Sequence, residues 1–181
     1  MQTQADHARD LARALLEPPL PRRWAHSQGV ADRADTLASI VGADADLLRA
    51  SAWLHDIGYA PDLATTGFHP LDGARYLRDV EHAEPRLCGL VAHHSCARIE
   101  AEERGLADAL VAEFPPTDDV LTTPLIYCDM TTGPDGDRVD FDERLAEILS
   151  RYGEGDVVSR SMRRAAPTVR RAIADVEQRL G

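Results

Sequence analysis

Apolar residues in this chain recur three or four positions apart, and this helical spacing continues along most of the sequence. Leu47, Ala50, Leu54 and Ile57 form one such stripe. Residues at these intervals lie on one face of an α-helix, and an apolar face is normally buried. No alternation of apolar and polar residues, the mark of a half-buried strand, extends beyond a few positions. The sequence therefore predicts an all-α helical bundle without a sheet.

Proline, glycine and capping residues divide this pattern into separate helices. Thr3 can cap the first helix, and Pro18 ends it. The expected helices cover residues 3–17, 21–41, 44–57, 70–77, 85–94, 97–114, 118–129, 142–152 and 156–180, the last with a bend at Pro167. The stretch 131–137 is rich in Gly, Pro and Asp, so we expect a loop within a single domain that spans residues 1–181.

The length and the apolar content fit a globular protein. A chain of 181 residues can bury a hydrophobic core without disulfides, and 44% of its residues are apolar. No run approaches the roughly 18 apolar residues that a membrane span needs, and the polar first ten residues lack the pattern of a secretory signal. These features predict a cytoplasmic protein without a membrane partner.

The charge distribution bears on the class of partner. The formal net charge is −11, and the 20 basic residues, all of them Arg, are scattered among acids. Proteins that bind a nucleic-acid polymer usually show a basic stripe, which is missing here. A small phosphorylated substrate remains compatible with this charge, because a bound metal ion can supply the local positive charge.

Several ionisable residues fall on apolar helix faces. His26 lies one helical turn before Val30 and on the same apolar face, and Asp129 shares a face with Leu125. His94 follows the apolar face of the expected helix 85–94 in the same way, and the adjacent pair His55 and Asp56 ends the stripe of residues 47–57. A buried carboxylate without a partner is costly, whereas a divalent metal ion binds carboxylates and neutral imidazoles together. A single metal centre would explain why all of these ionisable residues lie on apolar helix faces.

Each of these residues also has an ordinary explanation. A single core histidine such as His26 is more often a hydrogen-bonding residue than a ligand. Asp129 alone can be a helix-ending residue, and His69, which precedes Pro70, can be a helix cap. All of these explanations would have to hold at once for the metal centre to be absent.

The spacing of these residues resembles that of a known family. His26, the pair His55-Asp56 and Asp129 are similar to the four defining ligands of the HD superfamily of metal-dependent phosphohydrolases, and His55-Asp56-Ile57-Gly58 matches its extended signature. The resemblance covers about residues 20–152, with an additional helix on either side. It implies an all-helical HD fold in which the four ligands bind one metal ion and Asp56 also reaches a second.

Further histidines resemble those of the binuclear members of the superfamily. By this resemblance His69 and His93 would bind the second metal ion, with His94 as an additional candidate. The expected cofactors are two divalent transition-metal ions, Mn, Fe, Co or Ni. The Gly-Tyr-Pro element of the cyclic-dinucleotide phosphodiesterases is missing after the His pair, where Ser95-Cys96-Ala97 stands. The resemblance is therefore greater to the nucleotide phosphatases of the superfamily.

The expected activity is hydrolysis of a phosphoester or phosphoanhydride in a small, nucleotide-type substrate. Paired cations would activate a water molecule for attack on phosphorus, and the bridging Asp56 would be the catalytic residue. Arg23 and Arg98 are candidates to bind the phosphate oxygens, although each can also be a solvated surface charge.

Two alternatives from other classes remain at this stage. The HD fold also includes di-iron oxygenases with the same ligand pattern, and an oxygen-dependent reaction with iron would favour that class. A non-catalytic nucleotide-binding or regulatory module would keep the metal ions for stability. It would bind phosphorylated compounds, with a rise in melting temperature, but would not turn them over.

Overall fold

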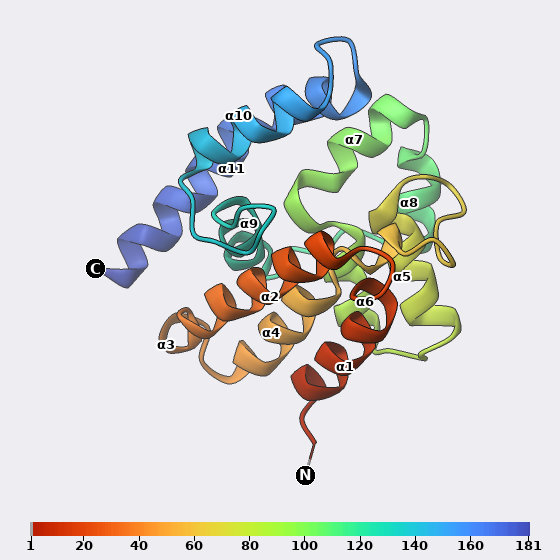
Figure 1. The fold of residues 1–181 in the computed structure, drawn as a ribbon. Helices are drawn as coiled ribbons and strands as arrows, with labels where there is room; N and C mark the ends of the chain where they lie inside the picture. The colour runs from red at the N-terminus through yellow and green to blue at the C-terminus, as the bar shows by residue number, and fades with distance from the viewer. Residues whose placement is uncertain (1) are drawn as a thin grey trace.

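The computed structural model of the protein describes residues 2–181 and consists of α-helices joined by short 3-10 turns and loops (Figure 1). The helices are α1 (Gln4–Leu16), α2 (Pro21–Asp35), α3 (Ala38–Val41), α4 (Ala45–Leu54), α5 (His69–Asp79), α6 (Pro85–Ala92), α7 (Ala97–Arg104), α8 (Ala107–Glu113), α9 (Thr122–Met130), α10 (Phe141–Arg151) and α11 (Val157–Leu180). The 3-10 turns are η1 (Gly42–Asp44), η2 (Ile57–Tyr59) and η3 (His94–Cys96). Residues 2–181 contain no strand, which confirms the predicted all-α class.

Local capping explains where several helices begin. Thr3 caps α1 in a capping box with Asp6, as its position predicts, and Asp140 forms the same arrangement with Glu143 at the start of α10. Asp156 caps α11, whose helical geometry continues across Pro167. Within the described part of the chain, none of these helices is both long and apolar enough to cross a lipid bilayer.

Two expected helices are interrupted in the structure. The helix expected over 21–41 ends at Asp35, where the Thr36 hydroxyl donates to the Arg33 carbonyl oxygen, and only the short α3 follows. The helix expected over 97–114 is divided at Gly105, which has a φ of +70° and caps the end of α7. Both predictions were wrong because the apolar spacing continues across a local break in the backbone.

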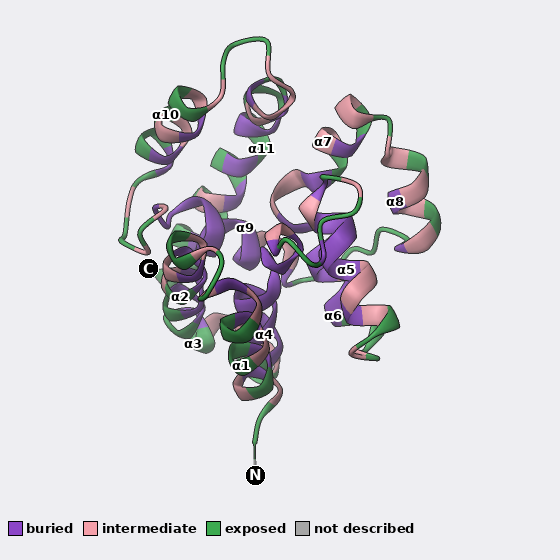
Figure 2. Cartoon of the chain, turned by 45° about the vertical axis from the view of Figure 1, so that its right-hand side comes forward, coloured by how far each residue is buried: buried purple, intermediate pink, exposed green. Residues whose placement is uncertain are grey.

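The helices pack around α9, which lies in the interior. Every residue from Pro124 to Met130 is buried, and α9 contacts α2 and α4 on one side and α11 on the other. Figure 1 shows α1, α2 and α4 side by side below α9, with α10 and α11 crossing above it. The buried residues concentrate along α9, α4 and α5 in the centre of Figure 2. Asp129 therefore lies in a helix that is surrounded by other helices.

Two glycine pairs allow segments near the centre to approach closely. A Cβ atom on Gly58 would lie 2.0 Å from the His69 carbonyl oxygen, so only glycine lets η2 pack against the start of α5. A Cβ atom on Gly29 would lie 2.2 Å from the carbonyl oxygen of Gly136. Because glycine has no Cβ atom, the loop after α9 can pack directly against α2. The first contact places His69 beside Asp56, and the second places the loop beside His26.

Candidate metal centre

Six of the predicted ligands come together in the interior, although they belong to different elements. They are His26 of α2, His55 and Asp56 after α4, His69 at the first position of α5, His94 of η3 and Asp129 of α9. All are buried except His69, which is partly exposed. They form two groups of three, and within each group the possible ligand atoms lie within 4.8 Å of one another.

The first group consists of His26, His55 and Asp129. Asp129 Oδ1 lies 3.0 Å from His26 Nε2 and 3.7 Å from His55 Nε2. Two imidazole nitrogens thus face one carboxylate oxygen across a space between three different helices. This set of nitrogen and oxygen donors is typical of a site for a divalent transition-metal ion.

The second group consists of Asp56, His69 and His94. Asp56 Oδ1 lies 3.3 Å from His69 Nε2 and 3.8 Å from His94 Nε2. The other oxygen, Oδ2, faces the first group, at 3.4 Å from His55 Nε2 and 3.9 Å from His26 Nε2. The carboxylate of Asp56 therefore lies between the two groups, with one oxygen directed to each.

Backbone carbonyl groups fix the orientation of three imidazole rings. The Nδ1 atoms of His26, His55 and His94 lie 2.9, 2.7 and 2.7 Å from the carbonyl oxygens of Gly133, Ala52 and Val91. A carbonyl oxygen only accepts, so each Nδ1 donates its proton. When the ring is neutral, Nε2 then presents a lone pair to the centre, as a metal ligand requires.

One buried atom tests whether these residues fit a metal ion. His55 Nε2 is buried and has no hydrogen-bond partner, although two carboxylates lie within 3.7 Å of it. An unpartnered polar atom in the interior is costly, and such atoms in native structures usually have a ligand, water or ion as partner. A metal ion between the imidazoles and the carboxylates would bind His55 Nε2 and so give it a partner. The residues of the cluster therefore fit a metal ion.

The charges of the cluster are strongly coupled. Burial lowers the pKa of His55, but the carboxylates of Asp56 and Asp129 outweigh it and raise this pKa to about 9. Burial raises the pKa of Asp56, but His55 and Arg23 hold it well below the usual value. Burial, with His69 and His55 nearby, lowers the pKa of His94 to about 4. Without a metal ion, the proton on His55 partly offsets the two carboxylates.

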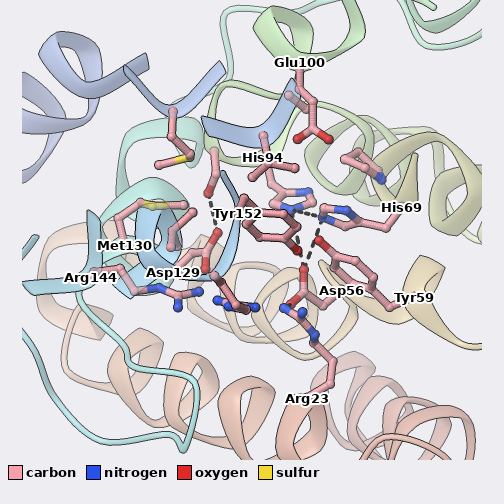
Figure 3. Close-up of a pocket in the computed structure, with 17 residues that line it drawn as sticks. Arg23, Asp56, Tyr59, His69, His94, Glu100, Asp129, Met130, Arg144 and Tyr152 are labelled. Atoms are coloured by element: carbon pink, nitrogen blue, oxygen red, sulfur yellow. Dashed lines mark hydrogen bonds and ion pairs between the residues drawn. The ribbon is translucent and has the colours of Figure 1, made fainter. Parts of the chain in front are cut away.

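Arg23, a candidate to bind phosphate oxygens, lies at the edge of the cluster. Its Nη1 atom donates to Asp56 Oδ2 at 2.8 Å, and its guanidinium group lies 4.0 Å above the ring of Tyr59. Tyr59 in turn stacks on His69, with 4.0 Å between the ring centroids. Figure 3 shows Asp56 between the two imidazoles of the second group and Arg23. The same residues line a pocket that opens from the cluster.

Two predicted site residues lie elsewhere, and both expectations need correction. His93 ends α6 and His94 begins η3, so their side chains point in different directions, and His93 Nε2 donates to the Phe114 carbonyl oxygen at 2.6 Å. His94, not His93, therefore joins His69. Arg98 lies in the first turn of α7 with an exposed side chain, 3.7 Å from Glu102, and does not line the pocket of the cluster.

Sequence reasoning missed several residues around the cluster. The Ser95 hydroxyl donates to Asp129 Oδ2, and Ser95 and Cys96 both have left-handed backbone geometry, with φ of +48° and +62°. No local sequence pattern predicts this left-handed turn. Arg144 of α10 also lines the pocket, and it lies on the buried face between Phe141 and Ile148. The spacing of Arg144 from Phe141 and Ile148 could have indicated a charged residue on a buried helix face.

Comparison with known proteins assigns the family. Residues 23–124 match the family model described as the HD domain, which is more than half of the chain. The chain therefore belongs to the HD domain family, a family of metal-dependent hydrolases in general, and the predicted resemblance is confirmed. The matched range includes the first five ligands along the chain, whereas Asp129, α10 and α11 lie beyond it.

Part of the chain is also similar to curated relatives named Ribonuclease Y. The relative from Rubrobacter xylanophilus is 34% identical over 88 residues, which is 49% of this chain and 16% of the relative. The relative from Rhodopirellula baltica is 36% identical over 92 residues, 51% of this chain and 15% of the relative. The chain thus spans less than a fifth of these relatives' length. No solved structure gives a significant match.

Proposed function

We propose that this protein is a metal-dependent phosphohydrolase that cleaves a phosphoester or phosphoanhydride in a small, nucleotide-type substrate. The position of Asp56 carries the proposal, because its two oxygens face two separate groups of ligands at the base of an open pocket. Two adjacent cation sites sharing a carboxylate are typical of enzymes that act on phosphate esters. Membership of the HD domain family supports the same chemistry.

The residues divide between two divalent ions. His26, His55 and Asp129 would hold one ion and His69 and His94 the other, with Asp56 shared between them. Imidazole and carboxylate donors suit Mn, Fe, Co or Ni. When bound, such ions supply a water molecule that ionises near neutral pH and positive charge for the phosphate oxygens.

The protein's own groups would orient the reactants. Hydrogen bonds from the three Nδ1 atoms keep the imidazoles in place, and Ser95 holds Asp129. Arg23 presents its guanidinium group beside Asp56, where it would donate hydrogen bonds to a phosphate oxygen. Burial of the cluster excludes bulk water and strengthens these charge interactions.

The similarity to Ribonuclease Y favours a second candidate, an RNA phosphodiester. The name of these relatives denotes cleavage of RNA, and the similar segment includes part of this chain only. We favour a small substrate, because the net charge of −11 opposes binding of a polyanion. A short RNA oligonucleotide is therefore an informative arm of the substrate screen.

The test combines metal analysis with a hydrolysis screen. Protein loaded with Mn²⁺ would be assayed on bis(p-nitrophenyl) phosphate, nucleotides, dinucleoside polyphosphates, sugar phosphates and a short RNA. We expect metal-dependent release of product from a small phosphorylated compound. Oxygen consumption by iron-loaded protein, with no hydrolysis, would instead indicate an oxygenase. Phosphorylated compounds that raise the melting temperature without turnover would indicate a binding module.

A further inference from the structure

Three arginine side chains border the pocket of the metal centre, and two of them come from α10. Arg23 of α2 and Arg144 and Arg151 of α10 line this pocket and also an adjoining small cavity, so they form the wall between the two. Figure 3 shows Arg144 of α10 and Arg23 of α2 directed toward the middle of the pocket. Arg23 lies at the start of the matched range 23–124, whereas Arg144 and Arg151 of α10 lie beyond it.

The two arginines of α10 are held in place by one shared acid. Arg144 Nη1 lies 2.8 Å from Glu147 Oε2, and Arg151 binds the two oxygens of Glu147 at 3.0 and 2.9 Å. The two arginines are seven positions apart, which is about two helical turns, so both lie on the face of α10 that carries Glu147. One carboxylate therefore orients two guanidinium groups.

The three arginines of this wall pair with only two carboxylates, and Asp129, which also lines the pocket, pairs with His26 instead. Arg23 is paired with Asp56, which belongs to the ligand cluster, and Glu147 is the acid shared by the other two. The Arg144 side chain is only 5% exposed, and its Nε atom is buried without a hydrogen-bond partner. Glu100 also lines the pocket but is paired with Arg104. A buried guanidinium with unused donors is stabilised by an anion.

We infer that Arg23, Arg144 and Arg151 form a phosphate subsite that binds a second phosphate group of the substrate, next to the one at the metal centre. Guanidinium groups donate paired hydrogen bonds to phosphate oxygens, and three of them around one space match a doubly charged group. The inference rests on the proposed hydrolysis for the identity of the ligand. It narrows the substrate class to phosphoanhydrides and to esters that carry a neighbouring phosphate.

Binding of inorganic phosphate to the metal-free protein tests the subsite without any turnover. After removal of metal ions with EDTA and dialysis, calorimetric titration should show one phosphate per chain. Arg144→Gln and Arg151→Gln should each weaken this binding about 10- to 100-fold, the usual effect of losing hydrogen bonds to a charged group. Arg163→Gln is the matched control, because Arg163 lies on α11, is half exposed and does not line the pocket.

Two results would overturn the subsite. One is a wild-type protein that binds no phosphate at millimolar concentration, and the other is equal binding by the wild type and both α10 variants. Arg151 is 35% exposed, so its variant should fold even if the change at the buried Arg144 disturbs the core; circular dichroism checks both.

A kinetic comparison separates this inference from the proposed function. In Mn²⁺-loaded protein, Arg151→Gln should lower kcat/KM for ATP about tenfold more than for bis(p-nitrophenyl) phosphate, which has a single phosphate group. An equal loss on both substrates would contradict a second-phosphate site. If neither compound is hydrolysed by the wild type, the proposed hydrolysis fails on these substrates, and the phosphate titration still decides the subsite.

Discussion

At the scale of single residues, the centre depends on how protons and metal ions compete for the same nitrogen atoms. His55 Nε2 lies within 3.7 Å of two carboxylates, and its other nitrogen is fixed by the Ala52 carbonyl oxygen. In the metal-free protein these carboxylates raise the pKa of His55 to about 9, well above the ordinary value for a histidine. A metal ion must therefore displace a proton from His55 at neutral pH.

This competition predicts the pH dependence of metal affinity. Because the folded-state pKa of His55 is raised, the proton is held up to about pH 9, and it opposes metal binding below that value. The apparent affinity for Mn²⁺ should rise about tenfold per pH unit between pH 7 and 8.5. Titration against a chelating dye measures the affinity, and buffers of different ionisation enthalpy report the released proton. An affinity that is constant over this range would rule out this role of His55.

At the scale of elements, the two candidate ligand groups meet because η2 packs tightly against the start of α5. Gly58 and Gly73 face each other in this contact, where a Cβ atom on Gly58 would also lie 2.7 Å from Gly73 N. The close approach sets the separation between Asp56 and His69. The lack of a side chain at Gly58 therefore allows the short distance between Asp56 and His69.

Substitution of Gly58 tests this contact. Gly58→Ala would force η2 and α5 apart, since the new Cβ atom meets backbone atoms that cannot rotate away; overpacking of this kind costs about 1–3 kcal/mol or more. We expect a lower melting temperature and weaker binding of the ion held by His69 and His94. Gly89→Ala is the control, because Gly89 lies in α6 and a Cβ atom added there would meet no other atom within 4 Å. Similar melting temperatures for both variants would contradict the account.

At the scale of the whole molecule, the candidate centre joins helices that are far apart in the sequence. His26 belongs to α2 and Asp129 to α9, and these helices also contact each other directly. A metal ion that binds only the folded protein stabilises it by mass action. Removal of the ions should therefore weaken the packing of the entire bundle, and not only the pocket.

Thermal unfolding measures this coupling. At a metal concentration about 100 times the dissociation constant, the melting temperature should rise roughly 5–10 °C above that of EDTA-treated protein. His26→Gln should lose most of this rise. His7→Gln, which changes an exposed histidine near the N-terminus, should retain it. An equal rise in both variants would mean that the ions bind elsewhere.

The sequence predicted the helical class from apolar spacing, and it predicted the six residues of the candidate centre from this spacing together with the family resemblance, which alone indicated His69. His26 and Asp129 were detectable as polar residues on apolar faces. Helical spacing placed His94 on the apolar face, whereas the family resemblance favoured His93 beside His69; the structure places His94 there, because the backbone changes direction between α6 and η3. Spacing did not place Arg98 outside the pocket or Arg144 inside it, because the packing of α7 and α10 depends on contacts between distant segments.

The number of metal ions per chain tests the central claim most directly. The wild-type protein, loaded with Mn²⁺ and freed of excess metal, should contain two ions per chain by elemental analysis. Asp56→Ala should reduce this number and abolish hydrolysis, because its carboxylate lies between both groups of ligands. Two ions per chain and full turnover in Asp56→Ala would contradict the account.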